Sequence, residues 1–399
     1  MDSRYILRRA DGELRCFYRS GGCIIQRTFS RNKWTKPTVA AGSARENFTL
    51  TMDGKGRVYL FAQETNGDII LCTDADGEWT SKVILENRSP RIYDLRLYPI
   101  MTGTSGTAGK GMWIIYNVPA PEERANYLVI QQAEAAGRWS PASRVDKFVP
   151  AGDFLFELQE VAKGHALMFY QTRTQEINIG YREITFGSGT SGYQQSGYNI
   201  FHSTNYFCTD HSFLTVPNAI HLLYIIKSMF SYQLIYRKKT SAYFDNPVVL
   251  WESQHIESCL LFYAKDNLHA VFCSNGAVYE CVSENKGETF YRAARYKNKC
   301  CLSPVKARYV SAQEQSENNF YCRQLYVNAE SPWDIQLLPE LCEDFYPETG
   351  GVTASGECQP DSDALKRMRD EISYMQAQMD EKDNQILRMS ATLKKYGAE

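Results

Sequence analysis

The sequence predicts an all-β fold, a seven-bladed β-propeller of four-stranded antiparallel blades, followed by a C-terminal α-helical coiled coil. Three observations predict it. Short apolar runs separated by turn residues recur over residues 1–343 with a period of about 45 residues. An aromatic residue opens the last strand of each repeat. Beyond a polar linker at 344–360, residues 361–397 place apolar residues at the spacing of a heptad.

Length and composition agree with this fold. The 399 residues exceed what one ordinary core holds, which leaves two domains or one large repetitive fold. With 43% hydrophobic and 23% charged residues the composition is that of a globular protein. A net charge of -2 gives no general attraction to phosphate groups, so we expect neither a nucleic-acid nor a membrane partner.

The clearest repeat covers residues 48–85. Its four apolar runs are separated by three turn dipeptides, Asp53-Gly54, Asn66-Gly67 and Asp76-Gly77. Because Asn-Gly and Asp-Gly accept the positive φ of tight hairpin turns, this stretch encodes a four-stranded antiparallel meander. Such a meander is one propeller blade.

The aromatic that opens the last strand recurs along the chain, at Trp34, Trp79, Trp139, Tyr198, Tyr243, Phe290 and Trp333. Insertions at 102–111 and 187–197 lengthen two of the intervals. Recurrence at one repeat position predicts that these rings fill the space between blades, with sugar platforms as the alternative. The last repeat shows only three strands, and an N-terminal strand at Tyr5-Ile6-Leu7 could close the ring. Six or eight blades therefore remain alternatives.

Two motifs resemble known propellers. The residues Ser283, Asn285, Gly287, Thr289 and Phe290 resemble the Asp-box of sialidase-like propellers, with Asn in place of Asp and Phe in place of Trp. The Trp-Ser/Thr pairs in three repeats look like the blades of fucose-lectin-type propellers. The resemblance implies that the Asp-box is a structural turn between the third and fourth strands of a blade. It also implies a glycan ligand as one alternative.

No catalytic residue can be assigned. A sialidase-like hydrolase would need an arginine cluster, a Tyr-Glu nucleophile pair and an acid/base Asp on one face, and no motif in the sequence identifies them. The twelve cysteines contain no Cys-x-x-Cys pair and the six histidines no His-x-x-x-His pair, so we expect neither metal nor cofactor. Reduced packing cysteines, and a start without a secretory signal, predict a cytoplasmic protein, with a secreted disulfide framework as the alternative.

The C-terminal segment predicts self-association. Heptad position a holds Leu365, Ile372, Met379, Ile386 and Leu393. Position d holds Met368, Met375, Lys382, Met389 and Tyr396. A seam only two positions wide suits pairing with a second helix better than folding back on the propeller, which is the alternative. A dimer and a trimer are both open, because methionine at d packs adaptably.

These observations predict a non-enzymatic binding or scaffold module. The propeller would present a face to a protein or glycan ligand, and the coiled coil would multiply that face. A carbohydrate-binding lectin is the first alternative, and a sialidase-like glycoside hydrolase is the second.

Overall fold

The computed structural model describes residues 4–30, 33–75, 77–87, 92–93, 95–101, 112–133, 138–152, 156–162, 164–187, 192–295, 304–311 and 320–332. The chain divides into two units, Met1–Phe345 and Tyr346–Glu399, and every described residue belongs to the first. The linker at 344–360, the ten coiled-coil positions, the insertion at 102–111 and Trp333 lie outside the described residues.

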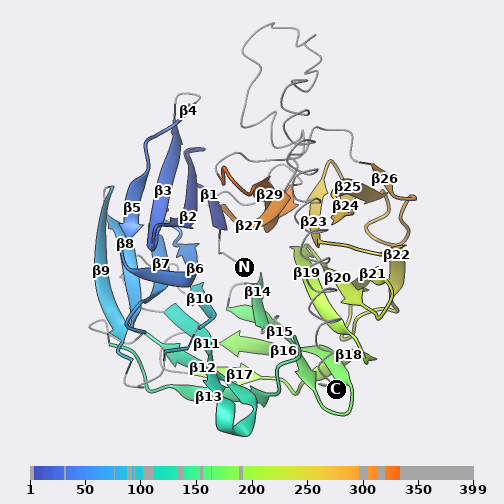
Figure 1. Cartoon of the computed structure of the whole chain (residues 1–399), viewed down its shortest axis with the longest axis horizontal. Coiled ribbons are helices and arrows are strands. Elements are labelled where there is room, and N and C mark those ends of the chain that lie inside the picture. The colour runs from blue at the N-terminus through green and yellow to red at the C-terminus, as the bar shows by residue number, and fades with distance from the viewer. Residues whose placement is uncertain are drawn as a thin grey trace, which may run out of the picture. The chain divides into compact units, whose positions relative to one another are not determined.

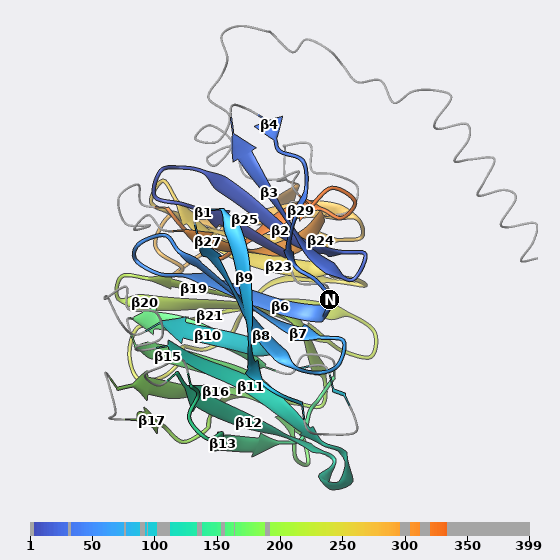
Figure 2. The same ribbon diagram turned by 90° about the vertical axis from the view of Figure 1, so that its left-hand side faces the viewer.

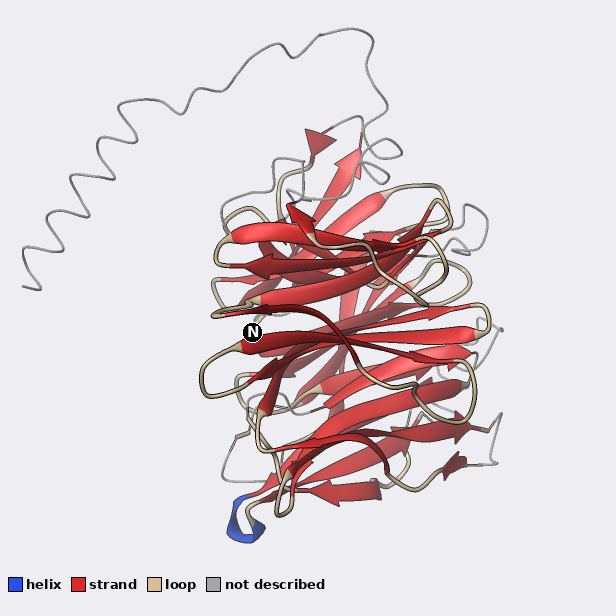
Figure 3. Ribbon diagram, turned by 90° about the vertical axis from the view of Figure 1, so that its right-hand side faces the viewer, coloured by secondary structure: helices blue, strands red, loops and turns tan. Residues whose placement is uncertain are grey.

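The described strands form six β-sheets, which stand around a common centre as the blades of a β-propeller (Figure 1). We number the sheets 1 to 6 in chain order. Figure 2 shows sheet 2 from the outside, with its last strand nearest the viewer, and Figure 3 shows that nearly all regular structure is strand. Within the described ranges, no helix has the length and hydropathy needed to cross a bilayer.

Sheets 2 and 3 are four-stranded. Sheet 2 contains β6 (Ala44–Met52), β7 (Val58–Glu64), β8 (Ile69–Ala75) and β9 (Glu78–Leu85). Sheet 3 contains β10 (Leu97–Met101), β11 (Met112–Ala120), β12 (Ala125–Gln132) and β13 (Ser143–Phe148). A short 3₁₀ turn, η1 (Pro121–Glu123), connects β11 to β12.

Sheets 4 and 5 follow the same plan. Sheet 4 contains β14 (Phe156–Ala162), β15 (His165–Arg173), β16 (Ile177–Phe186), β17 (Tyr193–Gln195) and β18 (Asn199–Thr204), the last two both pairing with β16. Sheet 5 contains β19 (Phe207–Val216), β20 (Ala219–Lys227), β21 (Tyr232–Lys239) and β22 (Val248–Ser253).

Sheets 6 and 1 contain strands from both ends of the described chain. Sheet 6 contains β23 (Ser258–Ala264), β24 (Asn267–Ser274), β25 (Ala277–Ser283), β26 (Ala294–Arg295) and β28 (Tyr321–Cys322). Sheet 1 contains β1 (Arg4–Arg8), β2 (Leu14–Ser20), β3 (Cys23–Ser30), β4 (Lys33–Trp34), β5 (Thr38–Ala41), β27 (Pro304–Ser311) and β29 (Gln324–Asn328).

Sheet 2 confirms the meander predicted for residues 48–85. Its register pairs Leu50 with Leu60 and Leu60 with Cys72, so apolar side chains of neighbouring strands lie on the same face. Gly67 has a φ of 96°, as the Asn-Gly turn requires. The first turn differs in detail, because the positive φ falls on Gly56 rather than on Gly54.

The predicted count of seven blades is not confirmed, because the described residues form six sheets. Strands β27 and β29 of the expected seventh repeat join sheet 1 instead of forming a sheet of their own. Strand β1 pairs in parallel with β27, with Tyr5 opposite Arg308 and Leu7 opposite Val310. The N-terminal strand therefore does close the ring, and the first and last repeats share one blade.

Five of the seven recurring aromatics pack between sheets, as predicted, namely Trp34, Trp79, Trp139, Tyr198 and Phe290. Six hydrophobic clusters occupy the six contacts between neighbouring sheets, including the contact between sheets 6 and 1. Each cluster contains one ring from the outer part of a sheet, packed against the preceding sheet. These rings are Trp34, Trp79, Trp139, Tyr198, Phe244 and Phe290.

One member of the predicted series is wrong. Tyr243 is 71% exposed, and its neighbour Phe244 occupies the cluster between sheets 4 and 5. Phe244 lies edge-on to Tyr181 at 5.5 Å and tilted against Phe201 at 5.2 Å. Neighbouring residues of an extended chain point to opposite sides, so a shift of one residue exchanges the buried ring for the exposed one.

Candidate functional site

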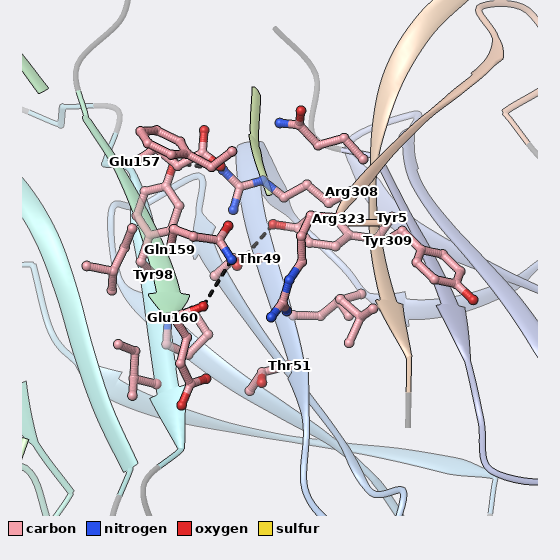
Figure 4. Close-up of a pocket in the computed structure, with 17 residues that line it drawn as sticks. Tyr5, Thr49, Thr51, Tyr98, Glu157, Gln159, Glu160, Arg308, Tyr309 and Arg323 are labelled. Carbon is pink, nitrogen blue, oxygen red and sulfur yellow. Dashed lines mark hydrogen bonds and ion pairs between the residues drawn. The ribbon is translucent and has the colours of Figure 1, made fainter. Parts of the chain in front are cut away.

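A cavity of about 140 Å³ lies near the centre of the propeller, and we call it the axial cavity. The strands nearest the centre supply its walls, namely β1, β6, β10, β14, β19 and β27, together with the connection from β28 to β29. Its polar lining comes from Tyr5, Thr49, Thr51, Tyr98, Glu157, Gln159, Glu160, Arg308, Tyr309, Arg323 and Gln324 (Figure 4). Residues far apart in the sequence therefore meet at one point.

Glu157 is held by two basic side chains. The distance from its Oε2 to Nε2 of His211 is 2.5 Å, and Oε1 lies 3.7 Å from Nη2 of Arg308. Burial of this carboxylate opposes its ionisation, but the charges of Arg308 and His211 outweigh burial and lower the pKa of Glu157 to about 2. Glu157 is therefore a fixed anion at neutral pH.

Arg308 connects this carboxylate to an aromatic ring. Its Nη2 donates a hydrogen bond of 2.8 Å to the hydroxyl of Tyr98, and its guanidinium lies 4.7 Å from the centroid of the same ring. The Tyr98 hydroxyl in turn donates to the carbonyl of Phe156 at 3.0 Å. Burial raises the pKa of Tyr98 to about 12. The geometry fixes both the orientation and the protonation of this wall.

Lys306 lies two residues before Arg308 on β27 and serves a structural role. Its Nζ donates to both carboxylate oxygens of Asp210 at 2.8 and 2.9 Å, and to the carbonyls of His211 and Cys259 at 2.7 and 3.0 Å. This buried ion pair joins sheets 1, 5 and 6. With its hydrogen bonds satisfied by the protein, Lys306 has no donor left for a ligand.

Arg323 occupies a different position from the other cations. It is the single residue between β28, which belongs to sheet 6, and β29, which belongs to sheet 1. Its carbonyl accepts a hydrogen bond of 2.8 Å from the amide of Tyr309, which fixes the backbone. The guanidinium points into the axial cavity (Figure 4).

The Asp-box-like residues form a hydrogen-bonded turn between β25 and β26, the third and fourth strands of sheet 6. Oδ1 of Asn285 accepts from the amide of Thr289 at 2.9 Å, and Oγ of Ser283 accepts from the amide of Gly287 at 2.8 Å. Gly287 has a φ of 87°, and a side chain there would collide with the hydroxyl of Tyr236. Phe290 packs on the Tyr236 ring at 4.7 Å. None of these residues lines the axial cavity.

No motif in the sequence pointed to the axial cavity. One signal was present, because Lys306 and Arg308 alternate with apolar residues in a strand near the centre of the ring. Charged side chains at such positions need partners across the axis. Among the described residues, no group of three or more His, Cys, Asp or Glu side chains is arranged to hold a metal ion.

Comparisons with known proteins do not assign a family. No protein-family model matches the sequence, and no curated protein matches it. Similar solved structures include the fucose-specific lectin from Aleuria aurantia, with a TM-score of 0.44 and 10% identity over 73% of this chain and 95% of that chain. A triple variant of AofleA from Arthrobotrys oligospora has a TM-score of 0.43 and 10% identity, over 74% and 86%. The polysaccharide lyase Uly1 has a TM-score of 0.46 and 9% identity, over 76% and 84%. At TM-scores below 0.5, these similarities assign neither a family nor a ligand to this chain.

Proposed function

We propose that this protein is a carbohydrate-binding module whose ligand occupies the axial cavity. One observation carries the proposal: the cavity is lined by charged, amide and hydroxyl side chains whose ionisation states and orientations are fixed by the surrounding sheets.

The fixed ionisation states favour binding over acid–base catalysis. A general acid or base works best when its pKa lies near the working pH. The pKa of Glu157 is lowered to about 2, against burial, by Arg308 and His211, while burial raises the pKa of Tyr98 and Tyr309 to about 12. At neutral pH these three groups neither release nor take up protons, so they serve as constant hydrogen-bond partners.

The chemistry of the lining suits a polyhydroxylated ligand. Three planar side chains supply the hydrogen-bonding groups. The carboxylate of Glu157 accepts through two oxygens, the amide of Gln159 both accepts and donates, and the guanidinium of Arg308 donates. Tyr5 and Tyr98 add hydroxyl groups to the wall. The Tyr5 hydroxyl is held by Oγ1 of Thr49 at 3.0 Å. A ligand would therefore meet groups that are already oriented.

The size of the cavity indicates a small ligand. Pockets for drug-sized ligands measure about 300–1,000 Å³, whereas the axial cavity measures about 140 Å³. We infer that one sugar unit, such as the terminal residue of a glycan, enters it. Multiplying such a weak site through the predicted coiled coil could raise avidity by roughly 10² to 10⁴.

Glycan-array binding by the full chain, followed by calorimetry on the best ligand, tests the proposal. Thr51→Phe places a ring in the cavity and is expected to weaken binding at least about tenfold, whereas Thr185→Phe, at an exposed position of β16, is expected to leave it unchanged. Mass spectrometry should show the ligand unaltered after incubation. Chemical conversion of the ligand, or an affinity that Thr51→Phe leaves unchanged, would contradict the proposal.

A further inference from the structure

Arg323 forms no ion pair with a described residue. Among the described residues, no carboxylate lies within ion-pair distance of its guanidinium, and no hydrogen-bond acceptor satisfies it. The neighbouring cations differ, because Lys306 is paired with Asp210 and Arg308 lies beside Glu157. The described carboxylates therefore pair with Lys306 and Arg308 and not with Arg323.

The surroundings of Arg323 leave its guanidinium open to a ligand. The side chain is exposed and lines the axial cavity, and the protein around it lowers the pKa of the guanidinium by desolvation, an effect that the charge of Glu160 opposes. A guanidinium keeps its proton in proteins, so Arg323 remains a cation here. An anion that enters the cavity can therefore reach it and form charge-assisted hydrogen bonds.

We propose that Arg323 binds the carboxylate of an acidic sugar, such as a uronic or sialic acid, in the axial cavity. This inference rests on the proposed function, because it assigns the class of sugar that the same cavity takes. The planar guanidinium can donate two parallel hydrogen bonds to a carboxylate. The hydroxyl groups of the sugar would then face Gln159 and Thr51.

The lining also indicates the charge of the ligand. Glu157 and Glu160 border the same cavity as Arg323. A dianion such as a phosphate monoester would be repelled by two carboxylates while it is attracted by Arg323. A single negative charge on a flat group satisfies the guanidinium with less repulsion, so we assign a carboxylate rather than a phosphate.

The experiment compares each acid with its own methyl ester, which has the same ring and no charge. Calorimetry on the full chain should show glucuronate, galacturonate or N-acetylneuraminate binding about 10- to 100-fold more tightly than its ester, the range for a hydrogen bond to a charged group. Arg323→Gln should abolish this preference by weakening binding of the acid much more than binding of the ester. Arg323→Lys should retain part of it. Arg295→Gln, at an exposed position of β26, is the matched control and should change neither the affinity for the acid nor the affinity for its ester.

The outcomes separate the two proposals. Equal binding of acid and ester by the wild-type chain would overturn the role of Arg323 while leaving the carbohydrate site standing. Preference for a sulfated or phosphorylated sugar over the carboxylate would overturn the choice of anion. Failure of every sugar and every ester to bind would refute the proposed function itself. Thermal unfolding of Arg323→Gln should occur near the wild-type temperature, because the side chain is exposed, and this control shows that the fold is intact.

Discussion

The charged residues at the centre of the ring divide into those that form ion pairs between sheets and Arg323, which forms none among the described residues. Lys306 and Arg308 lie on β27 and reach acidic partners on other sheets. Breaking such a buried pair costs more than the pair contributes, because the partner is left buried and uncompensated. Arg323 has no such partner among the described residues, so its replacement carries no comparable penalty.

Replacing Glu157 tests whether its ion pair with Arg308 stabilises the fold. Glu157→Gln should lower the free energy of unfolding at pH 7 by about 3 kcal/mol, because Arg308 loses its counter-charge and His211 loses its carboxylate partner. The pKa of Glu157 is lowered from 4.5 to about 2 in the folded chain, against burial, by Arg308 and His211. Its contribution is therefore complete above about pH 4.5 and is lost as pH falls toward 2.

Urea unfolding at neutral and acidic pH measures this effect. The wild type should lose stability between about pH 4.5 and 2 more steeply than Glu157→Gln does. Glu46→Gln, at an exposed position of β6, is the control and should change little at either pH. A Glu157→Gln variant as stable as the wild type at pH 7 would contradict the assignment of Glu157 as a structural anion.

At the scale of the element, each four-stranded sheet is too thin to bury its own side chains and depends on its neighbours. A ring near the outer edge of one sheet covers the inner face of the sheet before it. Trp79 lies edge-on to Phe17 at 6.0 Å, and Trp139 lies edge-on to Phe61 at 6.4 Å. The aromatic positions are thus a property of the contact between sheets rather than of one sheet.

The pair Tyr243 and Phe244 tests this interpretation within two adjacent residues. Phe244→Ala should lower the free energy of unfolding by about 2 kcal/mol, since a partly buried ring loses its contacts with Tyr181 and Phe201. Tyr243→Ala should change it by less than about 0.5 kcal/mol, because the ring is 71% exposed. Chemical denaturation of both variants measures the two losses of stability. A larger loss for Tyr243→Ala than for Phe244→Ala would support the register expected from the sequence.

At the scale of the whole molecule, both ends of the described chain take part in closing the ring. Strands β1 and β27 pair in parallel, and a hydrophobic cluster between sheets 6 and 1 completes the circle of contacts. Closure makes the axial cavity possible, since its walls come from strands that only a ring brings together. The predicted multiplication of this site depends on residues 361–397, which lie outside the described residues.

Light scattering on the full chain and on a chain ending at Glu343 tests that multiplication. We expect two or three protomers for the full chain and one for the shortened chain, because the apolar seam from Leu365 to Tyr396 is removed. The shortened chain should bind a monovalent sugar with unchanged affinity and a multivalent glycan surface more weakly. Equal protomer numbers in the two chains would refute self-association through the tail.

The sequence by itself determined the strands, the turns and the interval between repeats. These features depend on residues close together in the chain, such as the Asn66-Gly67 turn and the alternation of apolar residues in sheet 2. The tertiary structure alone decided that the first and last repeats share one sheet and that Phe244 rather than Tyr243 is buried. It alone brought Glu157, Arg308 and Arg323 to one cavity. Local turn and strand preferences say nothing about which distant strands become neighbours, because that choice is made by the burial of whole sheet faces when the ring closes.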